Sequence, residues 1–242
     1  MLEHILFIRT TLQSWCSSLY QTLQDIASPP HCAYCWKLLA TRTPLCTDCI
    51  ANMRPVVSYD LVINSNTTCV VHALSTYEEP LKSLIRAKQA RLVISSYHLG
   101  HLMADNQTSL AITKDDVLIP VPLHWQRYAW RGFNQAEIIA AVIARKHGAA
   151  VAPLLKRVKK TEYQAEVRSK EDRHTNVQDA FTWNARYKPS DYAHKRFILI
   201  DDLMTTGATL RIAGNALCAP YKKCHTTKPA IHAYVAARVL IT

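Results

Sequence analysis

Glycine is scarce in this chain, with five glycines among 242 residues. A chain so poor in glycine carries no glycine-rich linker, and no low-complexity stretch favours disorder. Long apolar runs are absent as well, because no stretch approaches the roughly 18 uninterrupted apolar residues of a membrane-spanning helix. Apolar residues still make up 49% of the chain, which is typical of a globular protein. The length suits one α/β domain of moderate size with a small appendage.

Negative charge is also in short supply. Asp and Glu number 18 against 29 Lys and Arg, which gives a formal net charge of +11 and an isoelectric point near 9.3. This balance favours anionic partners such as pyrophosphate compounds, nucleic acid or acidic lipid, without choosing among them. Glu3, His4 and Arg9 interrupt the apolar residues at the N-terminus, so a secretory signal peptide is not indicated. We therefore expect a cytoplasmic protein whose thiols stay reduced.

Four of the eight cysteines are spaced as a set. They form two Cys-x2-Cys pairs, Cys32 with Cys35 and Cys46 with Cys49, and ten residues separate the pairs. Two such pairs allow four thiolates to converge tetrahedrally on one zinc ion. Because no position would be left for water, we expect a structural rather than a catalytic site. Redox dithiols or unrelated buried thiols are the alternative.

Residues 1–28 have the pattern of an amphipathic helix. Apolar side chains recur at steps of three and four residues over most of this segment. These residues are Ile5, Ile8, Leu12, Trp15, Leu19 and Ile26. We expect the helix to pack against the body of the protein. Contact with a partner or with a second copy, and hence an oligomer, is the alternative.

The most informative segment is Phe197–Thr209, with the sequence FILIDDLMTTGAT. Its first four residues are all apolar, which predicts a strand buried on both faces, as in a parallel sheet covered by helices. Asp201 and Asp202 follow at the expected end of this strand, where ligands bind in open α/β sheets. Two adjacent carboxylates repel each other unless vicinal sugar hydroxyls or a metal ion offset their charge.

A hydroxyl-rich loop follows the acidic pair. Thr205, Thr206 and Thr209 supply hydroxyl groups, and Gly207 permits a tight turn with inward-facing amides. Residues 210–217 are predicted to form a helix, whose N-terminal amides and dipole favour a phosphate. Strand, acidic pair and loop together predict a site for a phosphorylated sugar. An ordinary core strand followed by an acidic helix cap is the alternative.

A second buried strand is predicted within residues 115–123, and its prolines should end the pairing. The segment that follows contains the sequence RGFNQAE at residues 131–137. Arg127 and Arg131 would share one face of a helical turn. The aromatic residues that interleave with these arginines are Trp125, Tyr128, Trp130 and Phe133. Packing in the protein interior would use such residues, and so would stacking on nucleic-acid bases.

Phe197–Thr209 resembles the motif with which type I phosphoribosyltransferases bind phosphoribosyl pyrophosphate (PRPP). The resemblance implies that Asp201 and Asp202 hold the ribose hydroxyls of magnesium-bound PRPP. It also implies that the loop wraps the 5-phosphate. The residues of this loop are Thr205, Thr206, Gly207, Ala208 and Thr209. Arg127 or Arg131 would assist the departure of pyrophosphate, which makes Arg131 a catalytic candidate beside the two aspartates.

The four-cysteine module and RGFNQAE extend the resemblance to the ComF family of competence-associated, phosphoribosyltransferase-like proteins. This resemblance covers the chain from about Cys32 to its end. The family's Tyr-x-x-Pro helix ends in a lysine, which is Lys88 here, so Lys88 joins the expected PRPP-binding residues. Residues 156–173, rich in Lys and Arg, resemble the family's segment that closes over the reaction centre. A solvated surface or contact with DNA are the alternatives for these residues.

The expected fold is an α/β, type I phosphoribosyltransferase-like parallel sheet behind a four-cysteine zinc module and a leading amphipathic helix. The expected boundaries are 1–28 for the helix, 29–56 for the zinc module and 57–242 for the sheet domain. The ComF resemblance implies a role in natural transformation, with incoming single-stranded DNA and a competence helicase as partners. Two hypotheses stay open: a phosphoribosyltransferase with an unspecified acceptor, and a non-catalytic adaptor that binds nucleotide or single-stranded DNA.

Overall fold

The computed structural model describes residues 28–87, 92–106, 110–158, 180–223 and 229–240. The chain divides into two compact units, and the boundary falls between Ile50 and Ala51. The smaller unit carries the four cysteines, and the larger unit carries the sheet. The predicted N-terminal helix, Lys88 and the basic segment beyond Val158 lie outside the described residues.

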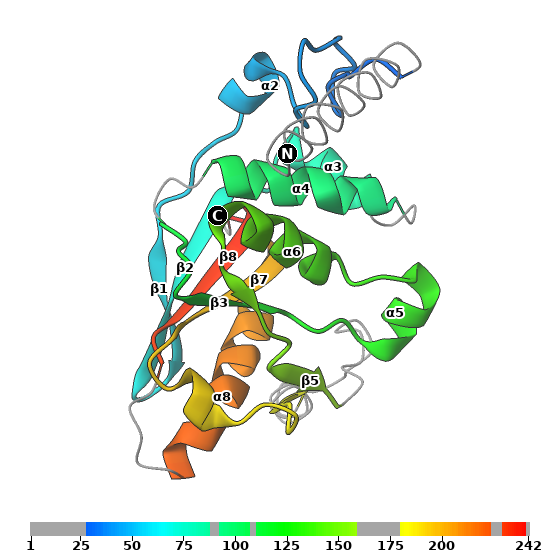
Figure 1. Ribbon diagram of the computed structural model, residues 1–242. Helices are drawn as coiled ribbons and strands as arrows, with labels where there is room; N and C mark the ends of the chain where they lie inside the picture. Colours follow the sequence, from blue (N-terminus) through cyan, green and yellow to red (C-terminus); the bar gives the residue numbers. More distant parts are fainter. Residues whose placement is uncertain (1–27, 88–91, 107–109, 159–179, 224–228, 241–242) are drawn as a thin grey trace, which may run out of the picture. The chain divides into compact units, whose positions relative to one another are not determined.

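A six-stranded sheet runs through the larger unit, in the order β1-β2-β8-β7-β3-β4 (Figure 1). All neighbouring strands are parallel except β1, which pairs antiparallel with β2 at one edge. The strands are β1 Tyr59–Asn64, β2 Thr67–Thr76, β3 Asp116–Pro120, β4 Ala150–Val151, β7 Arg196–Met204 and β8 Ile231–Arg238. A separate two-stranded ladder joins β5 (Leu155–Arg157) to β6 (Phe181–Trp183). The mainly parallel α/β fold expected from the sequence is confirmed.

Helices cover both faces of this sheet (Figure 1). One face carries α3 (Leu81–Ala87), α4 (Val93–Asp105) and α6 (Gln135–His147), and the other carries α8 (Ala208–Lys223). The remaining helical segments are α2 Thr47–Ala51, α5 Trp125–Arg131 and the 3-10 turn η2 Pro189–Tyr192. Because β7 is covered on both sides, its residues Phe197 to Ile200 are all 0% exposed. This explains why four apolar residues follow one another there without alternation.

The amino ends of the central strands are tied together by an ion pair. Arg196, the first residue of β7, donates from Nε to Oδ1 of Asp116 at 2.7 Å and from Nη2 to Oδ2 at 2.6 Å. Burial alone would raise the pKa of the Asp116 carboxyl, but the hydrogen bonds from Arg196 and Thr113, together with the charge of Arg196, outweigh burial and hold this pKa below its usual range. These two charged groups at the amino edge therefore satisfy each other.

No helix within the described ranges combines the length and the apolar character that crossing a membrane requires.

Candidate functional site

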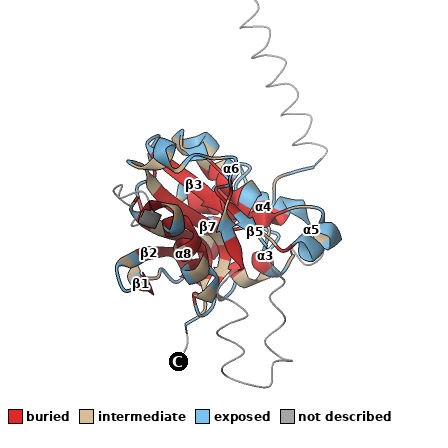
Figure 2. Cartoon of the chain, turned by 90° about the horizontal axis from the view of Figure 1, so that it is seen from below, coloured by how far each residue is buried: buried red, intermediate tan, exposed pale blue. Residues whose placement is uncertain are grey.

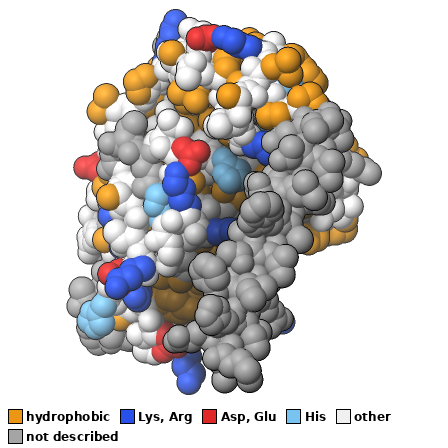
Figure 3. Space-filling view, turned by 45° about the horizontal axis from the view of Figure 1, so that its top comes forward, with side chains coloured by type: hydrophobic (Ala, Val, Ile, Leu, Met, Phe, Trp, Pro, Cys, Tyr) orange, Lys and Arg blue, Asp and Glu red, His pale blue; other side chains and the backbone are white. Residues whose placement is uncertain are grey.

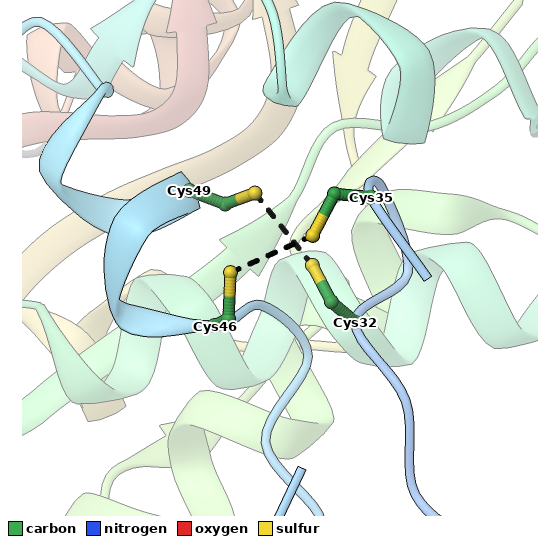
Figure 4. Close-up of side chains that lie close together, drawn as sticks. All are labelled: Cys32, Cys35, Cys46 and Cys49. Carbon is green, nitrogen blue, oxygen red and sulfur yellow. Dashed lines mark hydrogen bonds between the residues drawn. The ribbon is translucent and has the colours of Figure 1, made fainter. Parts of the chain in front are cut away.

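The four cysteines of the smaller unit converge on one point (Figure 4). Their Sγ atoms all lie within 4.8 Å of one another, with 3.7 Å between Cys32 and Cys49 and 3.6 Å between Cys35 and Cys46. Four sulfurs placed tetrahedrally around zinc at a Zn–S distance of about 2.3 Å would be about 3.8 Å apart. A disulfide would bring two of them to about 2.05 Å. The arrangement therefore fits a closed structural zinc site.

Backbone contacts position these ligands. The first pair sits on a turn in which the Trp36 amide donates to the Cys32 carbonyl at 3.0 Å, and Trp36 takes a positive φ of 64°. The Ala33 amide donates to the Pro44 carbonyl at 2.9 Å, which links this turn to the second pair. Cys49 lies on α2. Local backbone structure thus positions each pair, and the hydrogen bond between Ala33 and Pro44 connects the two pairs.

The surroundings of Cys32 favour its thiolate. Burial by itself raises the pKa of this thiol, but hydrogen bonds from the backbone of Cys35, Cys46 and Tyr34 lower it to about 6. Zinc is bound by thiolate rather than thiol. The backbone around Cys32 therefore stabilises the charged form that a metal ion needs.

The acidic pair of the larger unit lies inside β7 and not beyond its end. β7 continues to Met204 because its pairing with β8 extends past both aspartates, to Met204 opposite Arg238. Successive side chains of a strand point to opposite faces, and the two carboxylates accordingly differ in burial. Asp202 is 3% exposed, whereas Asp201 is partly exposed and accepts a hydrogen bond from the Asp202 amide at 2.9 Å.

The loop after β7 leads directly into α8. Thr205 and Thr206 are exposed, Gly207 has a φ of 76°, and α8 begins at Ala208. A side chain at Gly207 would be strained by this φ and would also meet Leu61, whose Cδ1 lies 3.2 Å from the position of a Cβ. The predicted turn and helix are thus present, with exposed hydroxyls at a helix N-terminus.

The RGFNQAE sequence shapes the junction between α5 and α6. Gly132 ends α5 with a φ of 82°, and its amide donates to the Tyr128 carbonyl at 2.7 Å. Asn134 caps α6 by accepting from the Ala136 amide, and its Nδ2 donates to the Val121 carbonyl, both at 3.2 Å. Arg131 donates to Oε1 of Gln135 at 3.3 Å. This sequence therefore positions the loop after β3 and the arginines of α5.

Helix α5 has no buried residue, and Figure 2 shows it exposed along its length. Trp125 is 69% exposed, Trp130 52% and Tyr128 48%. Arg127 is exposed between them. These three aromatic side chains do not pack in the interior, so of the two interpretations of their pattern the structure favours a contact surface.

Arg157 was not singled out by sequence reasoning, which placed it within a basic surface segment. It ends β5, with its Cζ 5.2 Å from the centre of the Phe181 ring. Burial lowers the pKa of its guanidinium; the positive charge of Arg127 lowers it further, and Asp201 opposes this. Arg157 therefore lies within electrostatic range of both Arg127 and Asp201. Its position follows from the pairing of β5 with β6, which the local sequence does not report.

Basic charge on the larger scale is dispersed. On the face shown in Figure 3, the Lys and Arg side chains of the described residues lie in separate small groups rather than in one continuous patch. The net charge of +11 therefore does not mark a single broad surface there. The positions of individual arginines are therefore more informative about a binding site than the net charge of the chain.

The parallel sheet, with an acidic pair in β7 and a hydroxyl loop leading into α8, defines a phosphoribosyltransferase-like fold. No protein-family model matches the chain. Competence protein F of Haemophilus influenzae is 28% identical over 193 residues, which cover 77% of this chain and 78% of that protein. Competence protein ComFC of Bacillus subtilis is 33% identical over 104 residues, covering 43% of this chain and 39% of that protein.

The DNA utilization protein YhgH of Salmonella typhi is 33% identical over 131 residues, covering 53% of this chain and 52% of that protein. These similarities agree with the four-cysteine module in front of the sheet domain. They support the resemblance to the ComF family.

Proposed function

We propose that this protein is a member of the ComF family, binds PRPP with magnesium at the carboxyl edge of its sheet and serves DNA uptake in natural transformation. The observation that supports this most directly is the continuous run of β7, its acidic pair, the exposed hydroxyl loop and the N-terminus of α8. Asp201 and Asp202 would hold the ribose hydroxyls and the metal ion. The Thr205–Thr209 loop would bind the 5-phosphate.

The pyrophosphate group would face the arginines. Burial and the positive charge of Arg127 lower the pKa of the Arg157 guanidinium, and Asp201 opposes this shift. A pyrophosphate bound beside Asp201 would bring its negative charge to these two arginines. Arg131 and, outside the described residues, Lys88 complete the proposed set. Binding of this kind precedes transfer to an acceptor and is equally what an adaptor needs.

Isothermal calorimetry tests this proposal. The full-length protein is expected to bind PRPP in the presence of magnesium, and to bind it more weakly when magnesium is chelated, because the metal ion would offset the negative charges of the acidic pair and of the ligand. Glucose 6-phosphate, a phosphorylated sugar without a pyrophosphate, serves as the comparison. Absence of heat with PRPP and magnesium would remove the proposal.

The names of the similar proteins suggest partners for this chain. The relatives are named for competence and DNA utilization, so we propose single-stranded DNA and a competence helicase as partners in the cytoplasm. The zinc module would be a structural platform for such contacts. Release of pyrophosphate in the presence of DNA or free bases would extend the proposal from binding to phosphoribosyl transfer.

Helix α5 favours a second function, the binding of single-stranded nucleic acid. Its exposed Trp125, Tyr128 and Trp130 can stack on bases, and Arg127 can meet the phosphates between them. No Asp or Glu occurs from residue 117 to residue 136, so nothing within this stretch repels a polyanion. The combination is characteristic of sequence-tolerant binding to single strands.

Replacing Trp125 and Trp130 by alanine should weaken binding to an oligothymidylate at least about tenfold, because base stacking contributes about 1–3 kcal/mol per base. Thermal stability should not change, since α5 buries none of its side chains. Fluorescence anisotropy over a series of salt concentrations measures the affinity and its salt dependence. Tyr97→Ala, on α4 and 46% exposed, is the control. Unchanged affinity in the double variant would show that α5 serves another contact.

A further inference from the structure

Arg238 ends β8 at the centre of the carboxyl edge. In the register of the sheet it lies opposite Met204 of β7 on one side and Thr76 of β2 on the other. Its carbonyl accepts from the Tyr77 amide at 2.8 Å, and the next residue, Val239, donates to the Met204 carbonyl at 2.9 Å. The backbone around Arg238 is therefore held in place from both neighbouring strands.

The guanidinium of Arg238 has no acidic partner among the described residues. Its Cζ lies 3.9 Å from the centre of the Tyr59 ring, so the flat face of the group rests on an aromatic side chain. Such stacking leaves the in-plane N–H donors available. Nε of Arg238 is buried and has no hydrogen-bond partner among the residues that the structure describes. Arg238 as a whole is partly exposed, so other atoms of the residue are accessible to solvent.

A second unmet polar group lies on the strand next to Arg238. Oγ1 of Thr76 is buried without a hydrogen-bond partner among the described residues, and Thr76 is 5% exposed. Thr76 and Arg238 are register partners at the ends of β2 and β8. Buried polar groups in folded proteins are nearly always hydrogen-bonded. Nε of Arg238 and Oγ1 of Thr76 are two exceptions on register partners. They therefore indicate a site where a ligand supplies missing hydrogen bonds.

A chain of contacts connects Arg238 to the loop before α8. Tyr59, which carries the guanidinium, donates from its hydroxyl to Sδ of Met204 at 3.1 Å. Cε of Met204 lies 3.4 Å from the position that a Cβ would occupy at Gly207. Contacts through Tyr59 and Met204 thus connect Arg238 to the turn that contains Thr205 and Thr206. It is a positive charge next to a loop that itself contains no Lys or Arg.

We propose that Arg238 binds the phosphate monoester of the sugar ligand held by the Thr205–Thr209 loop, with the Tyr59 ring as its platform. This inference rests on the proposed PRPP site and assigns a cation to its monoester end. The arginines of α5 and Arg157 remain with the pyrophosphate end. The hydroxyl of Thr76 is the second donor on the same side.

Calorimetry with two partial ligands tests this assignment. Ribose 5-phosphate carries only the monoester, and magnesium pyrophosphate carries only the leaving group. Arg238→Gln should weaken binding of ribose 5-phosphate by about 10- to 100-fold, which is the loss of a charge-assisted hydrogen bond, and should leave pyrophosphate binding within about twofold. Arg238→Lys keeps the charge without the planar fork and should fall between the native protein and Arg238→Gln.

Arg145→Gln, an exposed arginine at the last turn of α6, is the control because it removes the same charge. Tyr59→Leu, which keeps Arg238 but removes its platform, should weaken ribose 5-phosphate binding about threefold or more and provides a second variant if Arg238→Gln does not fold. Equal weakening toward both partial ligands, or none, overturns the assignment while leaving the PRPP proposal intact. Failure of the native protein to bind PRPP removes both.

Discussion

Replacement of Cys49 by serine is expected to abolish zinc binding and to unfold the four-cysteine module, while the sheet domain stays folded. Within residues 28–50, the buried side chains are those of Pro44, Leu45 and three of the four cysteines. A unit with so small an apolar core depends on its metal for stability. Structural zinc contributes about 10–16 kcal/mol to the folding of zinc-finger peptides, which is more than a module of this size gains from burial.

Elemental analysis and limited proteolysis together measure this effect. The native protein should carry one zinc ion, and Cys49→Ser should lose it and become sensitive to protease within the module. Cys69→Ser is the matched control, because Cys69 is equally buried but lies on β2. Its zinc content should stay at one ion per chain. A native protein purified without zinc, or a Cys49→Ser variant that retains it, would contradict the assignment of the four ligands.

Conversion of both aspartates of β7 to asparagine should weaken PRPP binding at least about 100-fold, a loss of about 3 kcal/mol. The sign of this effect is informative. Removing two negative charges close to an anionic ligand would by Coulomb attraction alone strengthen binding. Weaker binding can therefore come only from lost contacts with the ribose hydroxyls and with magnesium. Asparagine keeps the size of the side chain, so the sheet should fold as before.

The two positions should also differ from each other. Asp201 is partly exposed and acts on Arg157, whereas Asp202 is buried. We expect Asp201→Asn to have the larger effect on affinity, and Asp202→Asn to lower the thermal midpoint as well. Asp60→Asn, an exposed position on β1, controls for the change in charge. Calorimetry with PRPP and magnesium, beside thermal denaturation, separates these outcomes, and tighter binding by the double variant would reject the proposed role of the pair.

The sequence predicted those parts of the molecule that depend on neighbouring residues. The zinc ligands fall into two short pairs, and the buried strand at Phe197 to Ile200 is marked by its own composition. The loop at Gly207 is marked by glycine in a glycine-poor chain. In each case the residues that make the structure lie close together along the chain, so their spacing carries the geometry.

Other features depended on partners far away in the sequence. β7 extends beyond Asp202 because β8 continues opposite it, and no local pattern reports the length of a neighbouring strand. Arg157 and Arg238 lie at the ends of β5 and β8, where register alone brings them to the site. The exposure of Trp125 and Trp130 could not be predicted from the sequence either, because alternating aromatic residues and arginines occur both in interiors and on surfaces.

Helix α5 is joined to the sheet domain through its two ends, at the His124 cap and at Gly132, and contributes no side chain to the core. Most substitutions that destabilise proteins do so by disturbing a core or a buried polar network. Changes along α5 therefore cost the fold little. Natural variation can therefore change the surface of this helix one residue at a time, without a compensating change elsewhere in the fold.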